Sequence, residues 1–246
     1  MKFHALSNFQ EPQPLDFFVE GLIPKGFPTL LYGDGGKGKS YLALYLAHCI
    51  AMNRRFLGLK VQQGNVLYLD WEMDRDETLR RSYRISRGIG LAQPPSGLFY
   101  SPCYEVIDSI TDKLEYECRQ NNVNFVIYDS FGAASGSSDD YSKEAVQRVY
   151  GAAKKVGQTS LFIDHVSKSK PADGHAPMPF GSIYKKNFAR SLLYMDFISF
   201  DEQEKSMLCS LEQTKNNLSS MFEKRMVKTT FQRDRVVIEH CHYMGS

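Results

Sequence analysis

The sequence lacks an uninterrupted run of about 18 apolar residues, the length at which a helix becomes a candidate for crossing a membrane. It also lacks an apolar core of signal-peptide type near residue 1. We therefore expect no membrane partner. Cysteine is sparse: none of the five residues is spaced as C-x-x-C, so neither a disulfide framework nor a structural zinc site is indicated. This cysteine usage fits a reducing, cytoplasmic compartment.

An excess of charge of one sign is also missing, because the formal net charge is only +2. Overall charge therefore indicates no partner, and any contact with nucleic acid must come from a local cluster of basic residues. We find no internal repeat, low-complexity tract or convincing linker. The sequence predicts an irregular lead-in over residues 1–20 and one domain over residues 21–240.

Apolar runs and helical patterns alternate along the first two thirds of the chain. Four short runs, rich in aliphatic and aromatic residues, predict buried strands at 29–33, 65–70, 124–129 and 160–164. Between and after them, helices are predicted at 39–52, 75–89, 105–121 and 142–155, the last capped by Asp140 or Ser142. This alternation predicts an α/β fold with a mostly parallel, twisted sheet flanked by helices. Segments 191–200, 206–215 and 235–240 predict consecutive C-terminal strands at an antiparallel edge.

One loop carries a complete phosphate-binding pattern. The segment GDGGKGKS, residues 33–40, fits G-x-x-x-x-G-K-[ST] at each fixed position, between a predicted strand and a predicted helix. Its glycines allow backbone N–H groups to surround a phosphate, and the following helix N-terminus favours negative charge. The lysine reaches the β- and γ-phosphates, and the serine hydroxyl ligates Mg²⁺. The pattern predicts ATP and Mg²⁺ as cofactors, with contacts from Gly33, Asp34, Gly35, Gly36, Lys37, Gly38, Lys39, Ser40 and Tyr41.

Two later strand ends supply the acidic groups that nucleotide hydrolysis needs. Asp129 ends an apolar strand and is followed by Ser130, as expected of a carboxylate that holds Mg²⁺ through water. No acid follows Asp129 directly, so the residue that activates water must come from elsewhere. Glu72, just past the strand that ends at Asp70, is placed to polarise a water molecule, because sites in parallel sheets gather at the carboxyl ends of strands. Asp70 is the rival candidate for this base.

The order of these motifs, followed by LFIDHVSK and GSIYKKNFARS, resembles that of RecA-superfamily ATPases, most of all the RepA-like hexameric helicases. The resemblance covers roughly residues 15–240. It implies that Glu72 is the catalytic base and that His165 senses the γ-phosphate. RepA-like members often carry two histidines there, whereas this chain has Asp164 before His165. Arg81 is a candidate for stacking on the adenine, with an ordinary exposed helix arginine as the alternative.

The same resemblance implies an active site shared between subunits of a homo-oligomer, which is either a hexameric ring or a filament. A neighbouring subunit would donate a cation to the transition state, worth about 10³ to 10⁵ in rate. Arg190 matches the arginine-finger position of RepA-like helicases. Lys215 resembles a lysine at the same stage of RecA proteins, with Asn217 in place of the second lysine of RecA.

A cluster of basic residues follows the fourth predicted core strand. In RecA-like rings, loops in this region line the central channel and touch DNA, so the resemblance implies contacts with single-stranded DNA. The sequence predicts these contacts for Lys168, Lys170, Lys185 and Lys186.

The sequence thus predicts a Mg²⁺-dependent ATPase that acts on DNA as a helicase- or translocase-like motor in replication or recombination. An alternative is an ATP-driven regulatory or recombination-mediator switch that uses the same assembly without unwinding. A third class, a P-loop kinase for a small molecule, is disfavoured because no acceptor-pocket motif or arginine-rich lid is present.

Overall fold

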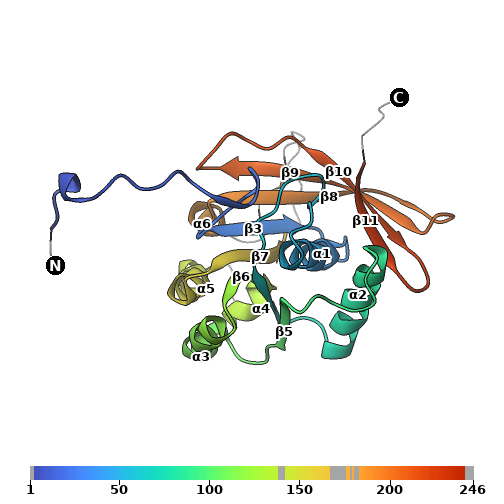
Figure 1. The fold of residues 1–246 in the computed structure, drawn as a ribbon, viewed down its shortest axis with the longest axis horizontal. Helices are drawn as coiled ribbons and strands as arrows, with labels where there is room; N and C mark the ends of the chain where they lie inside the picture. Colours follow the sequence, from blue (N-terminus) through green and yellow to red (C-terminus); the bar gives the residue numbers. More distant parts are fainter. Residues whose placement is uncertain (1–2, 138–141, 167–175, 178, 180–182, 242–246) are drawn as a thin grey trace.

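Figure 1 shows the fold in a computed structural model, which describes residues 3–137, 142–166, 176–177, 179 and 183–241. The first half of the chain contains a short 3-10 helix and two short strands, followed by the alternating elements. These are η1 (Leu6–Asn8), β1 (Phe17–Val19), β2 (Ile23–Pro24), β3 (Pro28–Gly33), α1 (Lys39–Ala51), β4 (Asn65–Asp70), α2 (Arg75–Gly88), β5 (Leu98–Pro102) and α3 (Ile107–Gln120).

The second half continues the alternation and ends in strands. Its elements are β6 (Val123–Asp129), α4 (Phe131–Ser135), α5 (Lys143–Val156), β7 (Thr159–His165), α6 (Ile183–Phe188), β8 (Ser191–Asp201), β9 (Ser206–Asn216), β10 (Arg225–Phe231) and β11 (Val236–Cys241). Ser142 caps α5 by accepting a hydrogen bond from the Ala145 amide, whereas Asp140, the other predicted cap, lies outside the described residues.

Within the described residues, one nine-stranded sheet has the order β11-β10-β9-β8-β3-β7-β6-β4-β5. The strands from β8 to β5 in this order run parallel to one another, and β9, β10 and β11 are antiparallel to their neighbours. The prediction of an α/β fold with a mostly parallel sheet and antiparallel C-terminal strands is confirmed. One detail differs: the first C-terminal strand, β8, pairs parallel with β3 and joins the core sheet.

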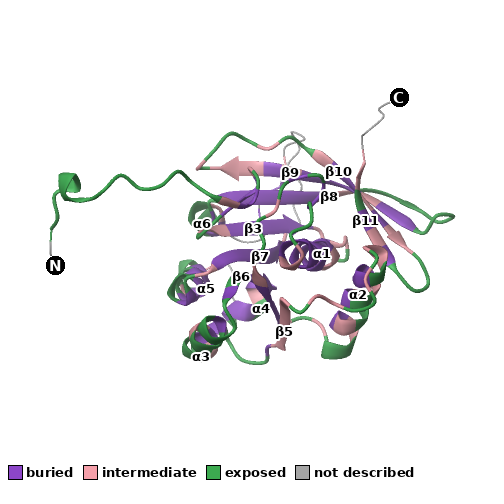
Figure 2. Ribbon diagram, viewed as in Figure 1, coloured by how far each residue is buried: buried purple, intermediate pink, exposed green. Residues whose placement is uncertain are grey.

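Two apolar clusters cover the two faces of the sheet. One cluster joins α1 and α2 to alternate strand residues such as Leu31, Tyr68 and Ile127, and the other joins α3, α4 and α5 to the residues between them. Figure 2 shows the central strands buried and the outer surfaces of the helices exposed. Because successive strand residues point to opposite faces, these clusters tell which face each functional side chain occupies.

The residues before β1 do not join either cluster. Residues 3–16 are exposed throughout and extend away from the body, as the blue end of the trace shows (Figure 1). Phe18 and Val19 are buried in the core, so the ordered domain begins within β1. No helix among the described residues is long and apolar enough to span a membrane.

Candidate functional site

Sheet register places four functional residues side by side. Gly33 pairs with His165 between β3 and β7, Asp129 pairs with Ile163 between β6 and β7, and Asp70 pairs with Asp129 between β4 and β6. All lie at the carboxyl ends of parallel strands, where open α/β sheets bind ligands. The sequence expectation that these strand ends meet is thus matched by the observed register.

The loop between β3 and α1 turns sharply at two glycines. Gly36 has φ 70° and Gly38, the N-cap of α1, has φ 87°, a region that other residues rarely adopt. An added Cβ at Gly38 would also lie 2.4 Å from the methyl carbon at the end of the flexible Met207 side chain, which would have to shift. The chain therefore needs glycine here to bring backbone N–H groups round to the start of the helix.

Lys39 is a buried cation that lies along this loop. Its Nζ donates to the carbonyls of Gly33 at 2.9 Å and Asp34 at 2.8 Å. Burial lowers the pKa of Lys39, and the carboxylates of Asp129 and Glu72 oppose that change. A lysine held in this way is a positive charge next to the helix N-terminus, where a phosphate group would bind.

Asp129 is the most deeply buried acid of the site. The Tyr68 hydroxyl donates to its Oδ2 at 2.5 Å, and Oδ1 has no hydrogen-bond partner among the residues that the structure describes. Burial raises the pKa of Asp129 to about 6, although hydrogen bonds from Tyr68 and Ser40 act in the opposite direction. A buried carboxylate oxygen without a partner is costly unless something else occupies it.

This unpaired oxygen makes the site suitable for a cation. Asp129 and the Ser40 hydroxyl are oxygen donors, and hard cations such as Mg²⁺ prefer one or two protein oxygens together with water and substrate phosphates. Across the described part of the chain, no cluster of three His, Cys, Asp or Glu residues is arranged to hold a metal ion by itself. The donor set therefore fits a Mg²⁺ ion that a nucleotide brings with it, with Ser40 and Asp129 as the protein groups.

Glu72 and His165 face each other across the mouth of the site. His165 Nε2 lies 3.5 Å from Glu72 Oε1, and both side chains are partly exposed. The hydrogen bond from His165 lowers the pKa of Glu72, with a smaller contribution from Ser130. Glu72 is therefore ionised at neutral pH and can accept a proton.

Both carboxylate oxygens of Asp70, the other candidate for the base, already accept hydrogen bonds. Its Oδ1 accepts from the amides of Glu72 and Met73, and its Oδ2 accepts from the hydroxyls of Thr78 and Tyr100. Asp70 is 2% exposed, and both of its oxygens already have partners. This geometry favours Glu72 over Asp70 as the base; Asp70 fixes the turn that carries Glu72.

One pocket collects most of the predicted nucleotide contacts. It is lined by Gly36, Lys37, Gly38, Lys39, Ser40, Tyr41, Glu72, Arg81, Asp129, Ile163 and His165. Gly33, Asp34 and Gly35 belong to the same loop but do not line this pocket. Arg81 pairs with Glu77 at 2.9 Å, and its guanidinium carbon lies 4.7 Å from the centre of the Tyr41 ring. Arg81 and Tyr41 thus form one wall of the pocket.

Asp164 and His165 point to opposite faces of β7. Asp164 lies on the face of α4 to α6, where its Oδ2 accepts from Lys185 Nζ at 2.7 Å. The side chains of Asp164 and Lys185 are 4% and 1% exposed, respectively. Lys185 is therefore unavailable to a phosphate backbone, and its prediction as a DNA contact is wrong. The sequence could not reveal this pair, because its members lie 21 residues apart.

The other predicted DNA contacts have different outcomes. Lys168 and Lys170 lie outside the described residues. Lys186 is half-buried near the end of α6, and its backbone carbonyl accepts a hydrogen bond from Lys215. The prediction that these three lysines contact DNA remains a prediction.

Arg190 and Lys215 lie together at the opposite end of the sheet. The Arg190 amide donates to the carbonyl of Pro28, the first residue of β3, and Lys215 pairs with Leu192 at the start of β8. Lys215 Nζ also donates to the Ala189 carbonyl at 2.7 Å. Burial lowers the pKa of Lys215, and the charges of Arg190 and Lys186 add to this effect.

This position decides how Arg190 can act. Strand β3 separates it from Gly33 by five residues, or about 17 Å at about 3.3 Å per residue. An arginine side chain does not bridge that distance, so Arg190 and Lys215 cannot serve the nucleotide pocket of their own chain. We name Lys186, Arg190 and Lys215 the basic edge cluster.

Sequence reasoning missed several residues of the site. Tyr68, which orients Asp129, was visible only as one aromatic residue in a strand. Thr78 and Tyr100, which hold Asp70, come from α2 and β5, and β5 was not predicted. The signal that was available is alternation: Tyr68 lies two residues before Asp70 and must share its face.

A family model described as AAA domain matches residues 2–171 of the chain, which is more than half of its length. The matched part includes the phosphate-binding loop, Glu72, Asp129 and His165. No curated protein matches the chain.

Replacing Asp129 by Asn should stabilise the fold. A rise of the pKa from its ordinary 3.8 to about 6 corresponds to about 3 kcal/mol at about 1.4 kcal/mol per unit. Because the folded-state pKa is raised, the wild type loses this stability as pH rises from about 4 through about 6. Urea unfolding should therefore show Asp129→Asn more stable by up to about 3 kcal/mol at pH 7.5 and by about half as much at pH 5.

Asp164→Asn is not a suitable control, because that carboxylate is paired; the exposed Glu223→Gln is a better one. Asp129→Asn should also lose any stabilisation by Mg²⁺ with nucleotide. A variant that is less stable than the wild type at pH 7.5 would contradict the view that Asp129 is a buried, strained carboxylate.

Proposed function

The chain belongs to the AAA domain family, and from this premise we propose that it hydrolyses ATP at a site that a neighbouring copy completes. The observation that carries the proposal is the separation of the site into two halves. The loop, Asp129, Glu72 and His165 lie at the carboxyl ends of the strands, and the basic edge cluster lies at the amino ends. A head-to-tail contact between copies brings the two halves together.

Each residue of the pocket then has a defined role. Backbone amides of the loop and Lys39 bind the phosphates, and Ser40 and Asp129 hold Mg²⁺, which neutralises charge on the phosphate oxygens. Glu72 accepts the proton of the attacking water. His165, 3.5 Å from Glu72, orients that carboxylate and lies where a γ-phosphate would approach. Arg81 and Tyr41 supply a flat surface for the base.

The basic edge cluster supplies the missing charge. Arg190 is exposed, and Lys215 is held by two backbone carbonyls, so the pair presents fixed cations at the protein surface. Cations that face a phosphoryl group in a closed site contribute about 10³ to 10⁵ in rate. They are otherwise a costly concentration of like charge, as the lowered pKa of Lys215 indicates.

We propose further that hydrolysis drives work on single-stranded DNA, as in helicase- or translocase-like motors. What supports this is the resemblance in motif order and the lysines that precede α6. The alternative is an ATP-driven switch with the same shared site. The two differ in whether DNA changes the rate of hydrolysis.

Glu72→Gln should keep nucleotide affinity and lower kcat about 10²- to 10⁴-fold, because the amide cannot accept the proton. Asp70→Asn should instead lower thermal stability, by about 1–3 kcal/mol, because Thr78 or Tyr100 loses its acceptor. Calorimetric binding and steady-state turnover of both variants separate these effects. Near-normal kcat in Glu72→Gln would show that the base is another residue.

Mixing two inactive variants should restore activity. Arg190→Ala keeps Glu72, and Glu72→Gln keeps Arg190, so a site between one chain of each kind is complete. Random assembly at equal amounts makes about one quarter of the sites complete, and we expect about a quarter of the wild-type rate. The matched control mixes Arg190→Ala with the double variant Arg190→Ala, Glu72→Gln, which provides no complete site. Equal rates in the two mixtures would contradict a shared site.

Single-stranded DNA should raise the rate of ATP hydrolysis, and Lys168→Ala with Lys170→Ala should remove that response and leave the basal rate unchanged. The stimulation should fall steeply with salt, because lysine contacts to phosphates release counterions. Lys154→Ala, on the exposed surface of α5, is the control. A wild-type rate that DNA does not change would favour the ATP-driven switch.

A further inference from the structure

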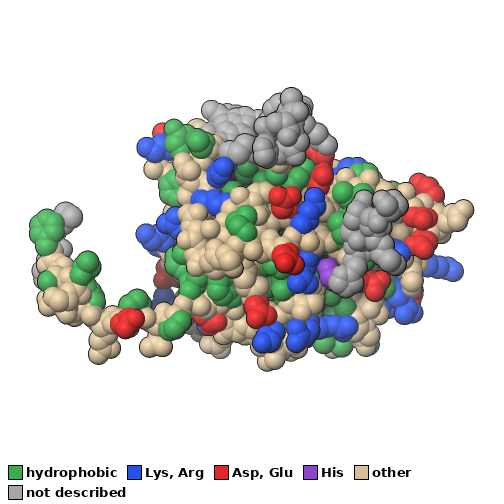
Figure 3. All heavy atoms as spheres, turned by 90° about the horizontal axis from the view of Figure 1, so that it is seen from above, with side chains coloured by type: hydrophobic (Ala, Val, Ile, Leu, Met, Phe, Trp, Pro, Cys, Tyr) green, Lys and Arg blue, Asp and Glu red, His purple; other side chains and the backbone are tan. Residues whose placement is uncertain are grey.

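One side of α2 carries a row of arginines. Arg80, Arg84 and Arg87 are spaced four and three residues apart, so they lie along the same side of the helix. Together with Tyr83, which is 40% exposed, they form what we call the arginine face. Acidic and basic side chains are interspersed over much of the molecule in Figure 3, whereas α2 contains five arginines against two acids. This helix therefore carries an excess of positive charge.

The arginine face borders a hollow of about 470 Å³. The hollow is lined by Asp76, Leu79, Arg80, Tyr83, Arg84 and Arg87. Three guanidinium groups thus face one carboxylate. A second acid, Glu77, pairs with Arg80 at 3.0 Å but also with Arg81 at 2.9 Å. These acids balance only part of the positive charge around the hollow.

Backbone carbonyls hold two of the three arginines in place. Arg84 Nη2 donates to the carbonyl of Gln232 at 2.6 Å, and Arg87 Nε donates to the carbonyl of Asp234 at 2.5 Å. Both carbonyls belong to the turn between β10 and β11, and the Asp234 carboxylate pairs with Arg235 at 3.4 Å. A carbonyl carries no formal charge, so it fixes a guanidinium group without neutralising it. Less side-chain entropy is then lost when the group binds an anion.

Arg84 also has a buried donor without an acceptor. Its Nε is one of four buried side-chain atoms that lack a hydrogen-bond partner among the described residues, and it is the only nitrogen of the four. An unpaired buried donor is costly, and an oxyanion is the acceptor that a guanidinium group binds most strongly. An anion in the hollow would therefore satisfy Arg84, as a cation would satisfy the unpaired oxygen of Asp129.

The side chains of the arginine face favour a nucleic-acid strand over other polyanions. Guanidinium groups bind phosphates through paired N–H donors, and an exposed aromatic ring beside them can stack on a base. At about 1.5 Å per residue the three arginines extend over about 10 Å, so they can face more than one phosphate. A membrane is disfavoured, because an interfacial helix needs a free apolar side, and the apolar side of α2 is turned into the core, where Ile85 is fully buried.

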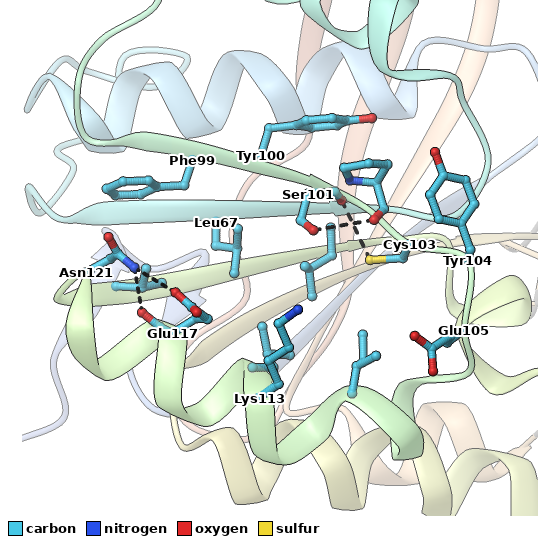
Figure 4. A pocket seen from close by; sticks show the side chains of 15 residues that line it. Leu67, Phe99, Tyr100, Ser101, Cys103, Tyr104, Glu105, Lys113, Glu117 and Asn121 are labelled. Atoms are coloured by element: carbon cyan, nitrogen blue, oxygen red, sulfur yellow. Dashed lines mark hydrogen bonds between the residues drawn. The ribbon is translucent and has the colours of Figure 1, made fainter.

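A second hollow of similar size lacks this charge. The cavity of about 400 Å³ beside the edge strand β5 is lined by apolar residues such as Leu67 and Phe99 and by charged groups of both signs. Figure 4 shows Lys113 and Glu117 projecting from α3 on the same side of it. This lining offers no excess of positive charge, so we assign no strand to it.

We propose that the arginine face binds a single strand of DNA, with phosphates on Arg80, Arg84 and Arg87 and a base on Tyr83. The choice of DNA as the strand rests on the proposed function, in which DNA is the partner of the motor. The surface is separate from the lysines that precede α6, because α2 and α6 lie on opposite sides of the body (Figure 1). The arginine face is thus an additional contact that holds DNA whether or not the strand reaches those lysines.

The first test measures the affinity of the full-length protein for a fluorescent oligothymidylate without ATP. In the variant Arg80→Gln, Arg84→Gln, Arg87→Gln, each lost phosphate contact should lower the affinity about fivefold at about 100 mM salt. The dissociation constant should therefore rise about 100-fold. The slope of log affinity against log salt should also become shallower by about 2. Fluorescence anisotropy over a series of salt concentrations gives both quantities.

A matched control removes the same amount of charge elsewhere. The variant Lys113→Gln, Arg119→Gln, Lys155→Gln changes three exposed cations on α3 and α5 and should leave the dissociation constant within about threefold. Replacing the three arginines of the arginine face by lysine keeps the charge and should weaken binding less than about tenfold. This second variant separates the loss of phosphate contacts from damage to the fold.

The second test locates the strand on the unaltered protein. An oligonucleotide that contains 5-bromodeoxyuridine is irradiated with the wild type, and the protein is then cut after glutamate. Mass spectrometry should find DNA on peptide 78–105, and fragmentation should place it at Tyr83. Tyr83→Ala should abolish this link and raise the dissociation constant on the order of tenfold, whereas Tyr83→Phe should keep both near the wild type.

Three outcomes would overturn the proposal. The first is a rise in the dissociation constant no larger than that of the control, or DNA linked only to peptides outside α2. The second is equal displacement of the DNA by inorganic tripolyphosphate at the same phosphate concentration, which would mark a simple anion site. The third is unchanged DNA affinity in the glutamine variant with loss of binding to phosphatidylserine vesicles, which would reassign the surface to a membrane.

These outcomes remain separate from the proposed function. If the Arg190 and Glu72 variants complement each other while the glutamine variant binds DNA like the wild type, the shared ATPase site stands and the arginine face falls. If DNA is linked to Tyr83 but does not change the rate of hydrolysis, the arginine face stands as a DNA-binding surface and the motor falls.

Discussion

The alignment of parallel strand ends is the constraint on which the site depends. Because β3, β7, β6 and β4 pair in one register, Gly33, His165, Asp129 and Asp70 arrive at the same edge without any contact between distant loops. Strand alternation then sorts neighbouring residues. His165 faces the nucleotide pocket, and Asp164 faces α6. Two adjacent residues thereby serve the two sides of one sheet.

Three buried carboxylates, Asp70, Asp129 and Asp164, lie at or near this edge of the sheet, and each has different hydrogen-bond partners. Asp70 is neutralised by four donors, so it acts as a scaffold. Asp164 is matched by Lys185, which ties β7 to the helix before Arg190. Of these three acids, only Asp129 retains a buried oxygen without a partner in the described residues. This unsatisfied carboxylate lies where a cation would bind, which is the usual relation between a functional site and local stability.

The fold and the pocket were largely predictable from the sequence because their signals are local. The glycine-rich loop is one continuous segment, and the strand-end acids follow apolar runs that mark the strands. The errors involved distance in sequence. Lys185 resembles an exposed base until its partner 21 residues earlier is known, and Asp70 resembles a base until Thr78 and Tyr100 surround it. Strand β5 was missed because its five residues are half-buried and contain Ser101 and Pro102, so no apolar run marks it.

The two ends of the parallel strands carry different kinds of groups. At the carboxyl ends the polar groups turn inward around a pocket. At the amino ends Arg190 and Lys215 are held at the surface, and the exposed residues 3–16 carry Phe3, Leu6 and Phe9 outward. Neither feature stabilises the chain that carries it: the cations repel one another, and the apolar side chains lie in water. Under the proposed function, a neighbouring copy that meets this edge offsets the repulsion between the cations, because its nucleotide phosphates face them.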